Sequence, residues 1–139
     1  MQRAGLSSRG RLVAIAVVTL LLGAVEAHAA TKTCKFDGDR DAITAGIKAE
    51  FSCEGAFEIL EPCALNTSGD NALSDIVLKK CEPRFLPAAT PAIKAAYAKA
   101  NAKCNQSAEK NEGSMYQGLA AVCRARAGRD FARKYGTRR

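Results

Sequence analysis

The sequence contains few large side chains from which a hydrophobic core can be built. It has no tryptophan, aromatic residues make up only 6% of its 139 residues, and much of its apolar content is alanine. Because alanine removes little apolar surface from water when it is buried, such a core needs further covalent support. No segment alternates apolar and polar residues over a useful length, so the sequence does not predict a β fold.

Histidine is almost absent, which restricts the possible chemistry. The only histidine is His28, which lies in an N-terminal segment that we expect to be removed. The remaining chain then has no imidazole for a Ser-His-Asp or Cys-His centre, or for a histidine-ligated metal. A carboxylate pair or a Ser-Lys dyad remains conceivable, but no recognisable motif contains either. We predict that the protein is not an enzyme, and a small hydrolase is the least favoured alternative.

Motifs that hold metals and cofactors are missing as well. No two cysteines are spaced as CxxC, and there is no glycine-rich phosphate loop. Asp37, Asp39 and Asp41 alternate like calcium ligands, but the twelfth position of that loop is Lys48, so a helix-capping turn is the better interpretation. Aromatic residues are not interleaved with basic ones, as a stacking surface for nucleic acid requires. We expect no cofactor, no metal and no nucleic acid.

Residues 1–29 have the composition of a secretory signal peptide. Three arginines and no acidic residue precede an apolar run over residues 12–25, and Ala27-His28-Ala29 has the small-x-small form of a cleavage site. A transmembrane helix needs about 20 apolar residues, and neither this run nor any later stretch is long enough. We predict a cleaved signal peptide, a single helical disulfide-rich domain over residues 30–139, and a periplasmic or secreted location.

All six cysteines follow the expected cleavage site. An even number of cysteines in an exported chain predicts a set of disulfides, here three, which would support the small core. The six are Cys34, Cys53, Cys63, Cys81, Cys104 and Cys123.

The strongest helical pattern lies between Thr90 and Tyr135. Thr90 followed by proline is typical of a helix start, and a polar segment over residues 105–113 separates this helix from a second one that Ser114 should cap. Two helices joined in this way form an αα-hairpin. The first helix has an apolar face of Ile93, Tyr97, Ala100 and Cys104. The second has an expected apolar face of Met115 or Tyr116, Leu119, Val122, Cys123, Ala127 and Phe131.

One disulfide can be predicted from this hairpin. If the first helix ends near Lys110 and the second begins at Ser114, Cys104 and Cys123 lie six and nine residues from the turn. At about 1.5 Å per residue the axial offset is roughly 4 to 5 Å, which a disulfide between packed helices tolerates. We predict Cys104–Cys123 and leave open the three possible pairings of the other four cysteines.

Shorter helices are expected upstream of the hairpin. Ile43, Ile47 and Phe51 share one face of a helix of about ten residues that runs toward Cys53, and Gly55 should interrupt it before a further helical turn over residues 57–60. Residues 66–71 are the clearest loop, and residues 83–91 form a proline-rich connector whose Phe85 and Leu86 should plug the core. The helix from about Ala72 has an apolar face of Leu73, Ile76, Val77 and Cys81. The predicted fold is all-α, a small disulfide-stapled bundle of four or five helices with a C-terminal αα-hairpin.

Charge is divided unevenly along the expected mature chain. Residues 30–75 contain four basic and nine acidic side chains, net −5, whereas residues 76–139 contain fourteen basic and four acidic ones, net +10. Each excess is either a solvated helix face, the commoner case, or a surface for a partner of opposite charge. The acidic row consists of Glu50, Glu54, Glu58 and Glu61. The basic row on the last helix consists of Arg124, Arg126, Arg129 and Arg133.

The spacing around the expected turn also resembles a known family. After Cys104 come eight residues, Gly113-Ser114-Met115, seven residues and Cys123, followed by an arginine-rich helix. This pattern resembles the C-terminal segment of the bacterial periplasmic lysozyme-inhibitor family of the LprI type, over about residues 90–135. The resemblance implies a small, exported, helical, cysteine-stapled protein that binds a host or competitor lysozyme.

Two binding functions follow from these observations. The first is an exported protein that blocks a lysozyme or similar cationic muramidase by surface occlusion, through the acidic row or the Gly113-Ser114-Met115 turn. The alternative is an immunity-type or structural cell-envelope protein that binds an anionic envelope component through its basic C-terminal helix. Salt should weaken binding of the second kind.

Overall fold

The computed structural model describes residues 33–137. The predicted signal peptide, residues 1–29, lies outside the described residues, as do Arg138 and Arg139. The described chain contains five α-helices, two short 3-10 helices and no strand, which confirms the predicted all-α fold. The elements are α1 (Arg40–Ala49), α2 (Cys53–Cys63), α3 (Asp70–Cys81), η1 (Glu82–Arg84), η2 (Leu86–Ala88), α4 (Pro91–Lys110) and α5 (Ser114–Tyr135).

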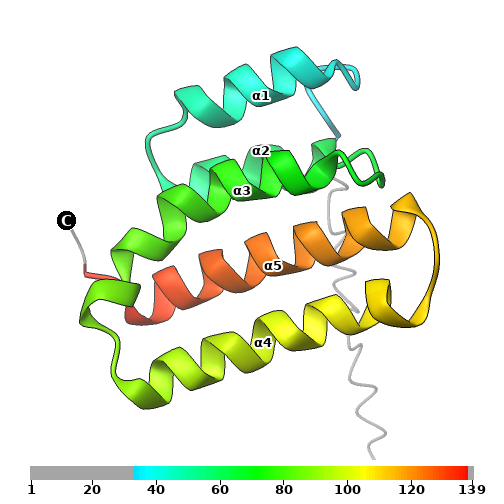
Figure 1. Cartoon of the computed structure of the whole chain (residues 1–139). Coiled ribbons are helices and arrows are strands. Elements are labelled where there is room, and N and C mark those ends of the chain that lie inside the picture. Colours follow the sequence, from blue (N-terminus) through cyan, green and yellow to red (C-terminus); the bar gives the residue numbers. More distant parts are fainter. Residues whose placement is uncertain (1–32, 138–139) are drawn as a thin grey trace, which may run out of the picture. The chain divides into compact units, whose positions relative to one another are not determined.

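Successive α-helices run antiparallel to each other (Figure 1). Helix α5 lies in the middle, with α4 packed along one side and α3 along the other, and α2 also contacts it. Helix α1 packs on α2 and α3. The α4–α5 turn and the α1–α2 connection therefore lie at opposite ends of the bundle (Figure 1).

Side-chain caps define the starts of three helices. The Asp39 carboxylate accepts hydrogen bonds from the amides of Asp41 and Ala42, which confirms the predicted capping turn before α1. Thr90 caps α4, as expected, with its hydroxyl accepting from the amide of Ile93 at 3.3 Å. Ser114 is not a cap, because α5 begins at Ser114 itself. The capping position belongs to Gly113, which has no side chain to cap the helix.

The break between the first two helices was predicted at the wrong place. It lies at residues 50–52 and not at Gly55, because the Ser52 hydroxyl accepts from the Gly55 amide at 2.9 Å and starts α2 before the glycine. Helix α1 has already ended at Ala49, so Phe51 leaves the face of Ile43 and Ile47. Its side chain is fully exposed, at 101%. The expectation that Phe51 continues the core face is therefore wrong.

Helix α5 buries small residues instead of the large ones that hydropathy suggested. Met115 and Leu119 are 48% and 44% exposed, and Cys123 is exposed as well, so this part of the predicted core face is wrong. A Cβ at Gly118 would lie 2.5 Å from the carbonyl oxygen of Thr67. A helix packed on both sides gains most contact where its own side chains are small enough for close approach. The buried residues of α5 are Gly118, Ala120, Ala121, Ala125, Gly128 and Ala132.

An aromatic cluster closes one end of the core. Phe85, in the connector between α3 and α4, is 1% exposed, which confirms the predicted plug. Its ring centroid lies 5.1 Å from that of Tyr97, edge to face, and 5.8 Å from that of Phe131. These contacts join the connector to α4 and α5.

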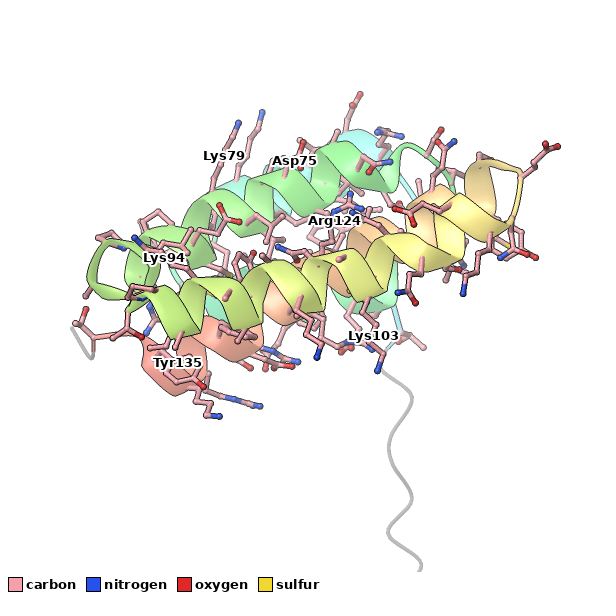
Figure 2. The ribbon with its side chains drawn as sticks, turned by 60° about the horizontal axis from the view of Figure 1, so that its bottom comes forward. Asp75, Lys79, Lys94, Lys103, Arg124 and Tyr135 are labelled. Atoms are coloured by element: carbon pink, nitrogen blue, oxygen red, sulfur yellow. A yellow bond between two sulfur atoms is a disulfide. The ribbon has the colours of Figure 1, made fainter. Side chains whose placement is uncertain are left out.

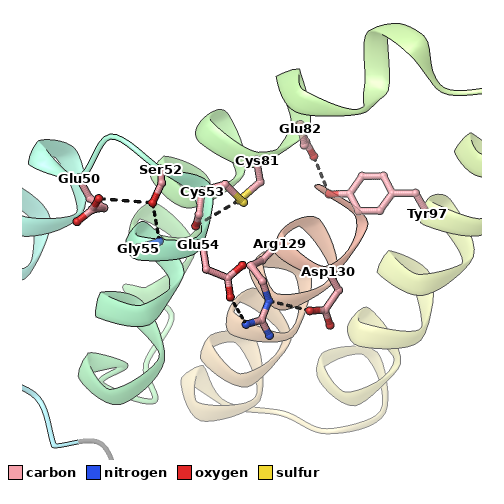
Figure 3. The surroundings of a disulfide bond; sticks show 10 residues. All are labelled: Glu50, Ser52, Cys53, Glu54, Gly55, Cys81, Glu82, Tyr97, Arg129 and Asp130. Atoms are coloured by element: carbon pink, nitrogen blue, oxygen red, sulfur yellow. Dashed lines mark hydrogen bonds and ion pairs between the residues drawn. A yellow bond between two sulfur atoms is a disulfide. The ribbon is translucent and has the colours of Figure 1, made fainter. Parts of the chain in front are cut away.

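Three disulfides hold the helices together, and the described residues contain no free cysteine. The Cys104–Cys123 bond joins α4 to α5 and confirms the prediction made from the hairpin. Cys34–Cys63 ties the segment before α1 to the end of α2, and Cys53–Cys81 ties the start of α2 to the end of α3 (Figure 3). Such bonds are typical of proteins that fold in an oxidising compartment.

Candidate binding surfaces

The two charged rows predicted to bind partners meet each other across the interface between α2 and α5. An Arg126 guanidinium nitrogen lies 2.9 Å from a Glu61 carboxylate oxygen, and the corresponding distance between Arg129 and Glu54 is 3.1 Å (Figure 3 shows the second pair). The Arg129 guanidinium also lies 4.4 Å from the ring centroid of Phe57. These contacts give part of each row a role in packing α2 against α5.

The remaining members of the two rows are placed differently. The Glu50 carboxylate accepts from the amide of Phe51 at 3.1 Å, and Glu58 is exposed on α2. Arg124 points between α3 and α4, where it donates to the side-chain oxygens of Asn71 and Asn105 at 2.8 and 2.7 Å (Figure 2). Arg133 is exposed, and its guanidinium lies 3.5 Å from the Asp130 carboxylate.

The α4–α5 turn and the start of α5 present an exposed apolar pair beside acidic residues. Gly113 has a φ of 113°, which favours glycine, and a Cβ there would meet no atom within 4 Å. Met115 and Leu119 are one helical turn apart, so their exposed side chains share one face of α5. Glu109 is exposed in the last turn of α4 and Glu112 is exposed in the turn itself, with the exposed Lys110 between them. We call Glu109, Glu112, Met115 and Leu119 the hairpin tip.

A shallow groove runs from Leu119 along the hairpin between α4 and α5. Its volume is about 420 Å³, and its lining is mainly apolar. Alanine side chains and the Cys104–Cys123 disulfide form much of that lining, with Lys103 and Asp130 among its charged residues. Hydropathy alone does not predict this surface, because it assigns the same apolar residues of α5 to the core.

Two further polar groups, the Asp70 carboxylate and the Tyr97 hydroxyl, have structural roles. The Asp70 carboxylate is completely buried and accepts from the amides of Leu65 and Thr67 at 3.0 and 3.2 Å, which shapes the loop before α3. The Tyr97 hydroxyl donates to Glu82 at 2.8 Å (Figure 3), and burial raises the pKa of Tyr97 to about 12. The Tyr97 phenol therefore keeps its proton to a higher pH than a solvent-exposed tyrosine does.

Neither a metal centre nor a membrane span is found in the described part of the chain. Residues 33–137 contain no group of three or more His, Cys, Asp or Glu side chains placed to hold a metal ion. No helix within the same range is both long enough and apolar enough to cross a bilayer.

Comparison of the chain with protein-family models, with curated proteins and with solved structures finds no match. The resemblance to the lysozyme-inhibitor family consequently stays a prediction, based on the cysteine and turn spacing over about residues 90–135.

Proposed function

We propose that this chain is an exported binding protein whose hairpin tip docks on a cationic protein, and that a lysozyme is the first partner to test. The proposal rests mainly on one observation, the exposure of Met115 and Leu119 on one face beside Glu109 and Glu112. Export to the periplasm or the exterior is part of the proposal. It is supported by the composition of residues 1–29 and by the three disulfides.

The chemistry of the hairpin tip suits a partner with a basic rim around an apolar depression. Methionine adapts its shape to a partner surface, and burying a Met or Leu side chain is worth about 1.5 to 3 kcal/mol when it is complete. Glu109 and Glu112 would attract a basic enzyme and speed association. Such a protein would inhibit by occupying the entrance to a substrate cleft, which requires no chemistry of its own.

The predicted acidic row supports this proposal less than the hairpin tip does. Glu54 and Glu61 are paired with Arg129 and Arg126, so a partner would have to displace those arginines. The same pairing weakens the alternative function, in which the basic C-terminal helix binds an anionic envelope component. Arg124 is likewise engaged by Asn71 and Asn105.

The test is a binding and inhibition assay with oxidised protein comprising residues 30–139. Calorimetry with a cationic lysozyme and a cell-wall lysis assay should show binding and inhibition by the parent. Replacing Met115→Ser and Leu119→Ser together should weaken binding at least tenfold, since anchor residues contribute about 1 kcal/mol or more each. Ala98→Ser is the matched control, because Ala98 is exposed on α4 and is not among the residues lining the hairpin groove.

Two results would contradict the proposal in different ways. Unchanged binding by the Met115→Ser, Leu119→Ser variant would show that the hairpin tip is not the docking site. No binding and no inhibition by excess oxidised parent would exclude lysozyme as the partner.

Replacing Glu109→Gln and Glu112→Gln together should lower the rate of association with the lysozyme and reduce the dependence of that rate on salt.

A further inference from the structure

The most exposed large apolar side chain of the described residues is not at the hairpin tip. Phe51 is 101% exposed, whereas Met115 and Leu119 keep about half of their surface covered. Phe51 lies in the α1–α2 connection, at the opposite end of the bundle from the α4–α5 turn (Figure 1). A single exposed apolar side chain is common on protein surfaces, so the inference rests on the basic residues that accompany the Phe51 ring.

The backbone that carries Phe51 is held firmly on both sides. The Lys80 ammonium donates to the carbonyl oxygens of Lys48 and Glu50 at 3.1 and 2.7 Å, which fixes the end of α1. The Phe51 amide donates to the Glu50 carboxylate, and Ser52 caps the next helix. The ring is therefore presented on a short rigid connection, which lowers the entropy lost when it binds.

Two basic side chains line a hollow beside this ring, and two more are exposed at the ends of nearby helices. Arg84 and Lys80 line a hollow of about 450 Å³ together with Phe51. Lys48 is exposed in the last turn of α1, and Lys79 is exposed in the last turn of α3, where Figure 2 shows it extending into solvent. We call Phe51 with Lys48, Lys79 and Arg84 the basic end.

Of the three acidic groups close to the basic end, Glu50 and Glu82 are already engaged. Glu50 accepts from the Phe51 amide, and Glu82 accepts from the Tyr97 hydroxyl. Asp75 also projects from α3, one helical turn before Lys79 (Figure 2). Within residues 33–137, no ion pair is found for Lys48, Lys79 or Arg84.

We infer that the basic end is a contact surface for an anionic lipid membrane. Cations near the last turn of a helix complement its dipole, which accounts for Lys48 and Lys79 but not for Phe51. A protruding aromatic ring with cations on the same end of the bundle fits the interface of a bilayer, where the ring enters the boundary of the acyl chains and the cations meet the lipid phosphates. A soluble anionic polymer would attract the same cations but would gain little from the ring.

This orientation leaves the hairpin tip pointing away from the membrane. The inference does not depend on the proposed lysozyme partner, because the two surfaces lie at opposite ends and share no residue. Contact at the membrane would concentrate the protein at an envelope surface while its other end stays available. The two proposals can therefore fail separately.

The test is vesicle binding by oxidised protein comprising residues 30–139. Vesicles of phosphatidylcholine with 40% phosphatidylglycerol should sediment the parent, and pure phosphatidylcholine vesicles should not. Phe51→Ser should lower the partition coefficient about tenfold or more, from the loss of one buried aromatic side chain. Arg84→Gln and Lys79→Gln should each lower it about fivefold. Leu119→Ser, at the far end, is the control and should bind as the parent does.

The absence of tryptophan provides a second measurement. Phe51→Trp should keep membrane binding, and its fluorescence should shift to the blue with the anionic vesicles but not with dextran sulfate. Because Phe51 is fully exposed, these variants should keep the circular dichroism spectrum of the parent. Equal binding by Phe51→Ser and the parent would overturn the inference. Binding to dextran sulfate that is as strong as binding to the vesicles, with no fluorescence shift in either case, would also overturn it. That result would indicate an anionic polymer as the ligand.

Discussion

The close contact between α5 and the loop before α3 makes Gly118→Ala a demanding test of the fold. An added Cβ would lie 2.5 Å from the carbonyl oxygen of Thr67, 2.7 Å from its amide nitrogen and 2.9 Å from the Asp70 carboxylate. None of these atoms can move cheaply, because the Asp70 carboxylate is buried and accepts from the amides of Leu65 and Thr67. The added methyl must push the loop away from α5.

The expected magnitude follows from three contributions. Alanine is preferred over glycine inside a helix by about 0.8 to 1 kcal/mol, which favours the variant. Overpacking a rigid contact costs about 1 to 3 kcal/mol, and weakening the hydrogen bonds of Asp70 adds about 1 kcal/mol. We therefore expect Gly118→Ala to lower the free energy of unfolding by about 1 to 3 kcal/mol.

The assay is urea unfolding of the oxidised protein, followed by circular dichroism, with two controls. At Gly128 an added Cβ would lie 2.6 Å from Cδ2 of Leu78, the end of a flexible side chain, so Gly128→Ala should change stability by less than about 0.5 kcal/mol. Ala98→Gly, at an exposed site of α4, should cost about 1 kcal/mol and calibrates helix propensity. If Gly118→Ala is as stable as the parent or more stable, the packing of α5 against this loop is wrong.

The remaining predictions concern the hairpin and its buried phenol. Replacing Cys104 and Cys123 by serine should cost about 3 kcal/mol. Amide hydrogen exchange should then show α4 opening first, because its only other buried side chain is Tyr97; unchanged protection of α4 would contradict this. Tyr97 has a pKa raised from 10.0 to about 12, so the unfolded chain loses this proton first as the pH rises. Its contribution to stability is present in full below pH 10.0 and is lost as the pH approaches about 12. Tyr97→Phe should remove that part of the alkaline loss in urea unfolding at several pH values, and an identical pH profile in parent and variant would refute the assignment.

Local patterns in the sequence were sufficient to predict much of the hairpin. Thr90 followed by Pro91 starts α4, as expected, and the helix ends at Lys110, the end that the disulfide argument assumed. The Cys104–Cys123 bond followed from helix rise and turn length alone, because both cysteines belong to the same pair of neighbouring helices. The other two pairings could not be ranked, since they depend on how α1, α2 and α3 stack.

Surface assignments depended on tertiary structure. Hydropathy placed Leu119 in the core, whereas a helix packed on both sides buries glycine and alanine at the closest contacts and turns its larger side chains outward. Phe51 reached the surface because α1 ends at Ala49 and the Ser52 cap begins α2 before Gly55, where the break was expected.

Composition and local periodicity were sufficient to predict the helical class, the three disulfides and the division of charge into an acidic and a basic part. The contacts of Glu54 with Arg129 and of Glu61 with Arg126 became evident only once the helices were packed. Residues 65 or more positions apart in the chain meet there, and no local pattern specifies which faces of two helices come together.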